Sequence, residues 1–184
     1  MKILIIDNYD SFTYNILNFI PDKYYCEVLR NDDVSILDAD KFDKIIISPG
    51  PGKPKETGLV NEFLMKYYKN KSILGVCLGM QCICELFGAS LRNLNNVLHG
   101  VKTKIQVLDT DCGIYKDIND QIVVGHYHSW VIDSLPEDIK ITAVNENNLI
   151  MSVKHTKYDL LGLQFHPESI LTNYGKNILL NWVN

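Results

Sequence analysis

Short apolar runs recur along the first half of the chain and end in glycine, proline or polar residues. Runs of about five apolar residues are typical of strands that are buried on both faces of a parallel sheet. The strands predicted in this way are Lys2–Ile6, Tyr25–Leu29, Lys44–Ser48 and Ser72–Val76.

The segments between these runs carry apolar residues at the spacing of a helix with one buried face. The predicted helices are Phe12–Ile20 after a cap at Asp10 or Ser11, a segment beginning near Thr57, and Leu78–Phe87 closed by Gly88. Because strand and helix alternate, we expect a parallel sheet with helices on both faces.

The pattern changes after residue 89, where alternating apolar and polar residues at Val101–Leu108 predict a strand with one buried face. The other elements expected in this half are strands at Ile139–Val144, Leu149–Val153 and Leu160–Phe165 and a final helix at Asn173–Val183. The predicted fold class is therefore α/β, with an open mixed, mainly parallel central sheet, helices on both faces and a β-rich second half. We expect residues 1–184 to form a single domain.

Composition narrows the classes of function. The 18 basic and 22 acidic side chains give a formal charge of −4, without blocks of lysine or arginine, which argues against nucleic acid and anionic lipid as partners. No apolar run approaches the roughly 20 residues of a membrane-spanning helix. Five cysteines without a secretion signal fit a reducing cytoplasm better than a disulfide framework.

The most informative local motif is Gly-Val-Cys-Leu-Gly at residues 75–79, where a predicted strand becomes a helix. It has the Gly-x-nucleophile-x-Gly form of a nucleophile elbow, a sharp turn that lifts the central side chain clear of the sheet. At a helix N-terminus Cys77 would be favoured as thiolate, and nearby N–H groups could hold an oxyanion. The same residues also fit a buried strand that simply ends in cysteine.

A cysteine nucleophile needs a base, and the base needs an orienting group. His166-Pro167-Glu168 offers both after a predicted strand, at the edge where ligands of open α/β sheets collect. If this segment is extended, as proline favours for the preceding residue, His166 and Glu168 share a face. The alternative is an ordinary surface turn.

Two further features could form sites. The loop Ser48–Pro54 contains two glycines and three prolines, so its backbone N–H groups could approach a substrate, although it lacks the ending of a Walker loop. His126 and His128 lie two apart on a probable strand, but no third metal ligand stands at a recognisable spacing. The remaining cysteines are interpreted as packing residues: Cys26, Cys82, Cys84 and Cys112.

These pieces together resemble a class I, or triad, glutamine amidotransferase over essentially the whole chain. The segments that carry the resemblance are Asp7–Thr13, Ser48–Gly52, Gly75–Gln81, Tyr127–Ser129 and Gln164–Ser169. The opening Asp-Asn-Tyr-Asp-Ser-Phe-Thr is similar to the small glutaminase subunits of anthranilate synthase (component II) and 4-amino-4-deoxychorismate synthase. The resemblance implies a flavodoxin-like sheet.

The resemblance also implies roles for individual residues. Cys77 matches the nucleophile, His166 the base and Glu168 its partner, and the N–H groups of Gly52 and Leu78 match the oxyanion hole. The positions that hold glutamine in the family are Gly50, Pro51, Gly52, Gln81, Ser129 and Trp130. Three positions depart from common family residues: Met80, His126 and Trp130.

By resemblance, the chain releases ammonia from L-glutamine through a thioester on Cys77 and delivers it to a chorismate-using synthase subunit. No cofactor or metal is expected in this chain, and Mg²⁺ is expected in the partner. Anthranilate synthesis for tryptophan and aminodeoxychorismate synthesis for folate remain alternative destinations. Other interpretations are a stand-alone γ-glutamyl cysteine hydrolase and a non-catalytic flavodoxin-like or receiver-like binding module.

Overall fold

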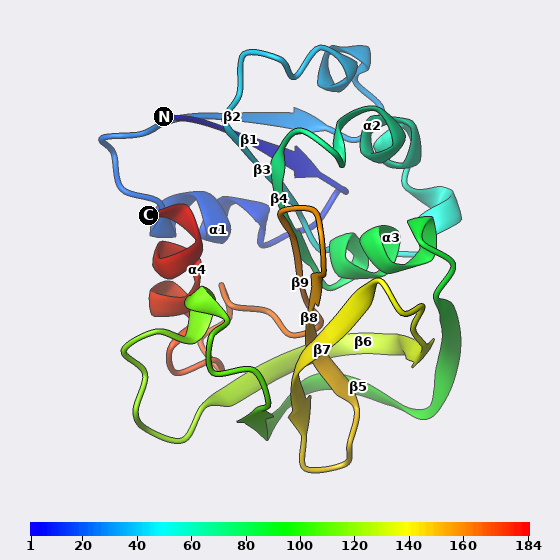
Figure 1. The fold of residues 1–184 in the computed structure, drawn as a ribbon, viewed down its shortest axis with the longest axis vertical. Helices are drawn as coiled ribbons and strands as arrows, with labels where there is room; N and C mark the ends of the chain where they lie inside the picture. The colour runs from blue at the N-terminus through cyan, green and yellow to red at the C-terminus, as the bar shows by residue number, and fades with distance from the viewer.

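The structure is a computed structural model that describes residues 1–184, and its nine strands form one sheet in the order β2-β1-β3-β4-β9-β8-β7-β5-β6 (Figure 1). The strands are β1 Lys2–Asp7, β2 Tyr25–Arg30, β3 Lys44–Ile47, β4 Ser72–Val76, β5 Ser90–Val107, β6 Val123–Ser134, β7 Ile139–Asn145, β8 Ile150–His155 and β9 Leu160–Leu163. The helices are α1 Thr13–Phe19, α2 Val60–Tyr67, α3 Leu78–Leu86 and α4 Gly175–Val183.

The sheet is mixed, which confirms the predicted fold class. The five neighbouring strands β2-β1-β3-β4-β9 run parallel to one another. From β9 the sheet continues through β8, β7, β5 and β6 with antiparallel pairing at every step. The β-rich second half thus extends the parallel half as one sheet.

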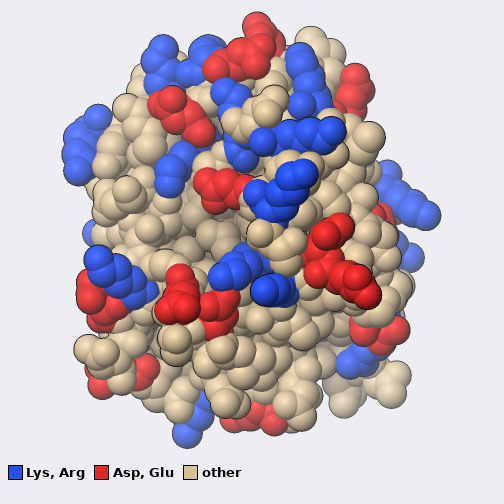
Figure 2. Space-filling model, viewed as in Figure 1, with Lys and Arg blue, Asp and Glu red and all other residues tan.

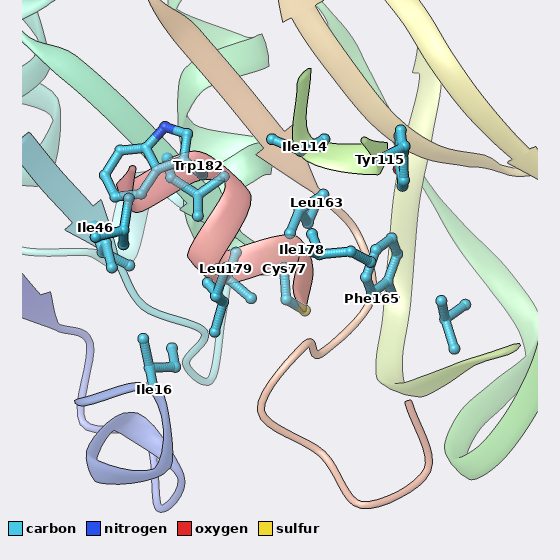
Figure 3. Close-up of a cluster of buried hydrophobic side chains, with 14 of the residues drawn as sticks. Ile16, Ile46, Cys77, Ile114, Tyr115, Leu163, Phe165, Ile178, Leu179 and Trp182 are labelled. Carbon is cyan, nitrogen blue, oxygen red and sulfur yellow. The ribbon is translucent and has the colours of Figure 1, made fainter. Parts of the chain in front are cut away.

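Helices cover both faces of the parallel half (Figure 1). Ile3 and Ile5 of β1 pack in one core cluster with residues of α1 and α4, whereas Leu4 and Ile6 pack in a second cluster with residues of α2 and α3. Figure 3 shows part of the first cluster, in which Cys77 lies with Leu163 and Phe165. Burial of both faces is the reason that these strands read as continuous apolar runs.

Two strand predictions were wrong in detail. β2 is an edge strand with half-exposed and exposed side chains rather than a buried strand, because only β1 pairs with it. β5 begins at Ser90, far before the predicted Val101. Its first part is rich in polar and exposed residues and forms a ribbon with β6, so it carries no apolar alternation that could reveal it.

The start of α3 at Leu78 was predicted correctly, whereas the predicted starts of the other helices were too early. α1 follows Phe12, which has no side-chain cap, although the Asp10 carboxylate accepts the Phe12 N–H at 2.7 Å. α2 begins at Val60, since Thr57 uses its hydroxyl to bond the Pro54 carbonyl at 2.7 Å in the turn before it.

The surface carries charges of both signs. Figure 2 shows Lys and Arg side chains interspersed with Asp and Glu on the face in view, without a large area of one sign. None of the four helices has both the length and the apolar character that a membrane crossing demands.

The corner between β4 and α3 is unusually tight. Cys77 has φ +50° and ψ −102°, a strained conformation for a residue with a side chain. A Cβ atom on Gly75 would lie 2.4 Å from backbone atoms of Gly79, and one on Gly79 would lie 2.3 Å from the Ile47 carbonyl oxygen. The two glycines therefore let α3 approach the sheet at the point where Cys77 is presented.

β6 buries two histidines that bond one another. His126 Nδ1 lies 3.2 Å from His128 Nε2, and His126 Nε2 lies 2.7 Å from the Thr103 hydroxyl. Burial lowers the pKa of His126 to about 4 and the pKa of His128 to about 3, so both rings are neutral at pH 7. The pair belongs to no group of three or more potential ligands that could hold a metal ion.

We predict that Gly79→Ala lowers the free energy of unfolding by about 2 kcal/mol or more, because the added methyl group meets backbone that cannot move aside. Gly113→Ala is the matched control, since nothing lies within 4 Å of the Cβ that it would add. Urea denaturation followed by circular dichroism measures both changes. A Gly79→Ala protein as stable as the Gly113→Ala protein would contradict this packing argument.

We also predict that the two neutral histidines make the protein less stable in mild acid. Their pKa values are depressed in the folded state, so the unfolded chain binds more protons below about pH 6.5, and stability falls from there towards pH 4. Each histidine contributes up to about 1.4 kcal/mol per pH unit in that window.

Denaturation at a series of pH values should therefore show a shallower acid slope in His126→Asn than in the original chain. The exposed residue His99, changed to Asn, provides the control and should leave the slope unchanged. An identical slope in His126→Asn would show that His126 is not held neutral.

Candidate active site

The parallel pairing of β4 with β9 brings together residues that lie 87 positions apart. Val76 is in register with Leu163, and the Cys77 N–H donates to the Leu163 carbonyl at 2.6 Å. Cys77 and Gln164 are thus the first residues after two neighbouring strands. His166 follows two residues later, at the same edge of the sheet.

His166 is held by backbone contacts from β6 and from the segment before α4. Its N–H donates to the Gly125 carbonyl at 3.1 Å, and its carbonyl accepts the Thr172 hydroxyl at 2.6 Å. The His-Pro-Glu segment is a buried turn and not the extended segment expected, with the Ser169 N–H bonded to the His166 carbonyl. A Cβ on Gly175 would lie 1.8 Å from the Pro167 carbonyl, so this turn packs directly on α4.

The turn nevertheless places the two predicted side chains together. His166 Nδ1 lies 2.6 Å from Glu168 Oε1, and both side chains are almost completely buried. Burial alone would lower the pKa of His166, but the neighbouring Cys77 thiol and the Glu168 carboxylate outweigh it and hold that pKa well above its ordinary value.

The other ring nitrogen of His166 remains available for proton transfer. Nε2 makes no hydrogen bond of good geometry, although Cys77 is close enough to influence the pKa of the ring. A thiol, an imidazole and a carboxylate therefore stand in the order that a nucleophile, a base and an orienting group require.

A pocket of about 190 Å³ opens beside Cys77. It is lined by the loop after β3, the start of α3 and the middle of β6. The residues that line it are Gly50, Pro51, Gly52, Cys77, Leu78, Gln81, Tyr127, His128, Ser129 and Trp130. Every residue that the family resemblance marks for glutamine or for the oxyanion hole lines this one pocket.

Two backbone donors are available at this pocket. Leu78 is the first residue of α3, so its N–H has no acceptor within the helix. Gly52 has φ +84°, which a residue with a side chain rarely adopts, and the neighbouring Lys53 N–H is held by the Glu56 carboxylate at 2.8 Å. These donors and the helix dipole favour negative charge near Cys77.

Asn8 anchors the loop that carries Gly52, a role that sequence reasoning missed. The Asn8 N–H donates to the Ser48 hydroxyl and its side-chain amide to the Ser48 carbonyl, both at 2.8 Å. Asn31 in turn donates to the Asn8 side-chain oxygen at 3.0 Å. A Cβ on Gly50 would lie 2.5 Å from Asn8, so loop and anchor are in direct contact. The only signal in the sequence was the position of Asn8 within the opening motif.

Trp130 closes one side of the pocket. The Lys53 ammonium group lies 4.2 Å from the centre of its ring, which links the loop after β3 to β6 through a cation–π contact. The Trp130 carbonyl accepts the Gln81 side-chain amide at 3.0 Å.

Tyr127 lines the pocket and also two larger cavities beside it, a place that sequence reasoning did not assign to it. Its ring packs edge-on against the His166 ring at 5.0 Å between centres, and its hydroxyl lies 3.0 Å from the Ser169 hydroxyl. Cys77 and His166 both line a cavity of about 330 Å³, and His166 and Glu168 line another of about 650 Å³ beside α1. The histidine can thus be approached from a side that the small pocket does not use.

Comparison with known proteins finds one matching family and several full-length relatives. The family described as Glutamine amidotransferase class-I matches residues 4–184. The putative anthranilate synthase component II of Haemophilus influenzae is 39% identical over 100% of this chain and 96% of its own length. Aminodeoxychorismate synthase component 2 of Klebsiella aerogenes is 40% identical over 99% of both proteins.

Among solved structures, a putative GMP synthase protein from Thermoplasma acidophilum has a similar fold. Its TM-score is 0.87 with 27% sequence identity, and the match covers 100% of this chain and 92% of the other. A family match over almost the whole sequence, together with full-length relatives at about 40% identity, leads to one conclusion: the chain belongs to the class I glutamine amidotransferase family.

Proposed function

We propose that the chain hydrolyses L-glutamine with Cys77 as nucleophile, His166 as acid and base, and Glu168 as the group that orients His166. The observation that carries this proposal is the meeting of Cys77 with the buried His166–Glu168 pair beside a pocket with backbone N–H donors. The pKa of His166 is held above its ordinary value by Cys77 and Glu168, which favours the imidazolium form that the proposed acid step requires.

The chemistry follows in two steps. The Cys77 thiolate attacks the carboxamide carbon of glutamine, and the N–H groups of Gly52 and Leu78 stabilise the oxyanion. His166 gives its proton to the departing nitrogen, so that ammonia leaves and a γ-glutamyl thioester remains. His166 then takes a proton from water, which attacks the thioester and releases glutamate and the Cys77 thiolate.

The pocket of about 190 Å³ is the proposed glutamine site. Its backbone groups would position the substrate's amino and carboxylate ends and place the carboxamide against Cys77. The residues assigned to this role are Gly50, Pro51, Gly52, Gln81, Ser129 and Trp130.

The ammonia is proposed to pass to a chorismate-using synthase subunit, which would also hold the Mg²⁺. The relatives named anthranilate synthase component II support the anthranilate role in tryptophan synthesis, and the relative named aminodeoxychorismate synthase component 2 supports the same step towards folate. We propose anthranilate synthesis first and aminodeoxychorismate synthesis second.

We also propose that residues 1–184 form one glutaminase unit and that it works in the cytoplasm.

Cys77→Ala should abolish glutamine-dependent synthesis in the complex while synthesis from added ammonium continues, because only the release of ammonia requires the sulfur. Product formation from chorismate with either nitrogen source measures this. Cys26→Ala on β2, at the far end of the parallel half, should behave like the original chain. Glutamine-dependent synthesis by Cys77→Ala would refute the proposed mechanism.

The isolated chain should turn over glutamine slowly, because Nε2 of His166 lacks a well-formed hydrogen bond until the site is completed. Adding the synthase subunit should raise kcat by about tenfold or more, equivalent to about 1.4 kcal/mol of better positioning. Glutamate release by the chain with and without the subunit tests this, and γ-glutamyl peptides serve as competing substrates. Equal kcat values in the two states would contradict it, and rapid peptide cleavage by the isolated chain would favour a stand-alone hydrolase.

A further inference from the structure

A line of buried amides connects the wall of the pocket to the reacting sulfur. Gln81 Nε2 donates to the Trp130 carbonyl at 3.0 Å and to Gln164 Oε1 at 3.2 Å. Gln164 Nε2 in turn lies 3.6 Å from Cys77 Sγ, within the range of an N–H···S hydrogen bond. Both glutamine side chains are buried, and Gln164 has no exposed surface.

A backbone carbonyl determines which atom of each amide is the donor in this hydrogen-bonded chain. The Trp130 carbonyl can only accept, so the Gln81 atom that faces it must be the NH₂ group. The second proton of that NH₂ group points to Gln164, whose facing atom must therefore be the oxygen. The NH₂ group of Gln164 is consequently directed at Cys77 Sγ.

A fixed donor at this place matters because the sulfur is buried and has to carry negative charge. A hydrogen bond to a charged acceptor is stronger than one between neutral groups, and in a buried site water cannot replace it. The backbone of Gln164 is itself held by its N–H bond to the Met151 carbonyl at 2.8 Å, so the donor is in place before substrate arrives.

We propose that Gln164 is a further catalytic residue of the glutaminase site, which donates its amide N–H to the Cys77 thiolate, and that Gln81 is the positioning residue that fixes the orientation of that amide. This inference rests on the proposed role of Cys77 as nucleophile. Gln81 then has a second role besides lining the pocket. The proposal also explains why the fully buried amide of Gln164 lies directly after β9.

The test measures thiolate reactivity directly, with iodoacetamide as the probe and mass spectrometry to locate the label. Because iodoacetamide lacks the amino and carboxylate groups of glutamine, its rate depends on the charge of the sulfur and on access to it, and not on the contacts of those two groups. We expect Gln164→Met to lower the rate of Cys77 labelling by about tenfold at neutral pH, and Gln81→Met to lower it in the same direction. Gln121→Met is the control, since the Gln121 amide bonds the Ile105 carbonyl and its side chain lines none of the three cavities, and the labelling rate of this variant should be unchanged.

Gln164→Glu separates a donor role from a merely structural one. The shape is kept, but a carboxylate faces the sulfur at neutral pH and repels the thiolate. As the pH falls and the carboxyl group of this variant becomes protonated, it regains an O–H donor. The labelling rate of Gln164→Glu relative to the original chain should therefore rise as the pH is lowered, whereas the relative rate of Gln164→Met should not rise.

Two further readouts complete the experiment. Gln164 does not line the pocket, so Gln164→Met in the complex with its synthase subunit should lower kcat with little change in KM for glutamine. Cys82 and Cys84 are fully buried and report on the integrity of the core, because they become labelled only if a variant loosens it. In that event the isosteric Gln164→Glu variant and its pH dependence decide the question.

A labelling rate for Gln164→Met within about twofold of the original chain, with Cys82 and Cys84 still unlabelled, would overturn the inference. Equal relative rates for Gln164→Glu and Gln164→Met at every pH would also overturn it. Neither result would contradict the proposed function. That function is tested by the loss of glutamine-dependent synthesis in Cys77→Ala and does not depend on the donor to the sulfur.

Discussion

The register between β4 and β9 is the constraint on which the site depends. These strands are far apart in the chain, yet Val76 lies opposite Leu163 and the Cys77 N–H bonds the Leu163 carbonyl. A one-residue shift would turn every side chain of β9 to the other face of the sheet and would carry the segment after it out of place. Cys77, Gln164 and His166 meet because both strands end at the same edge in this register.

The three buried histidines of this region show how partners decide protonation. Burial, and then the nearby positive charge of His166, lower the pKa values of His126 and His128, so that both rings stay uncharged. His166 is also almost completely buried, but Cys77 and Glu168 raise its pKa and favour the imidazolium. Because burial penalises charge in each case, the difference comes from the acidic partners, and only His166 has them.

The strained backbone of Cys77 is held in place by the residues packed around it. The positive φ of Cys77 persists because Gly75 and Gly79 allow α3 to lie against the end of β3. On the opposite side of the pocket, Asn8 holds Ser48 and contacts Gly50, so the loop that offers the Gly52 N–H is fixed from the first strand. Contacts from neighbouring elements therefore fix the backbone on both sides of the pocket.

The sequence by itself determined the elements that have a clear local pattern of apolar residues or glycines. Apolar runs such as Ile3–Ile6 predicted the buried parallel strands, and Gly75–Gly79 predicted the sharp turn at Cys77. It did not reveal the exposed ribbon that starts at Ser90, because a strand without a buried face has no apolar alternation. The sequence did predict the pairing of His166 with Glu168, although through an extended segment and not through the buried turn that the structure shows. It did not predict that Asn8 would hold the loop or that Gln164 would point at sulfur. Those contacts depend on segments distant in the chain, and they exist only because β9 inserts beside β4 and β1 lies beside β3, arrangements that local patterns do not encode.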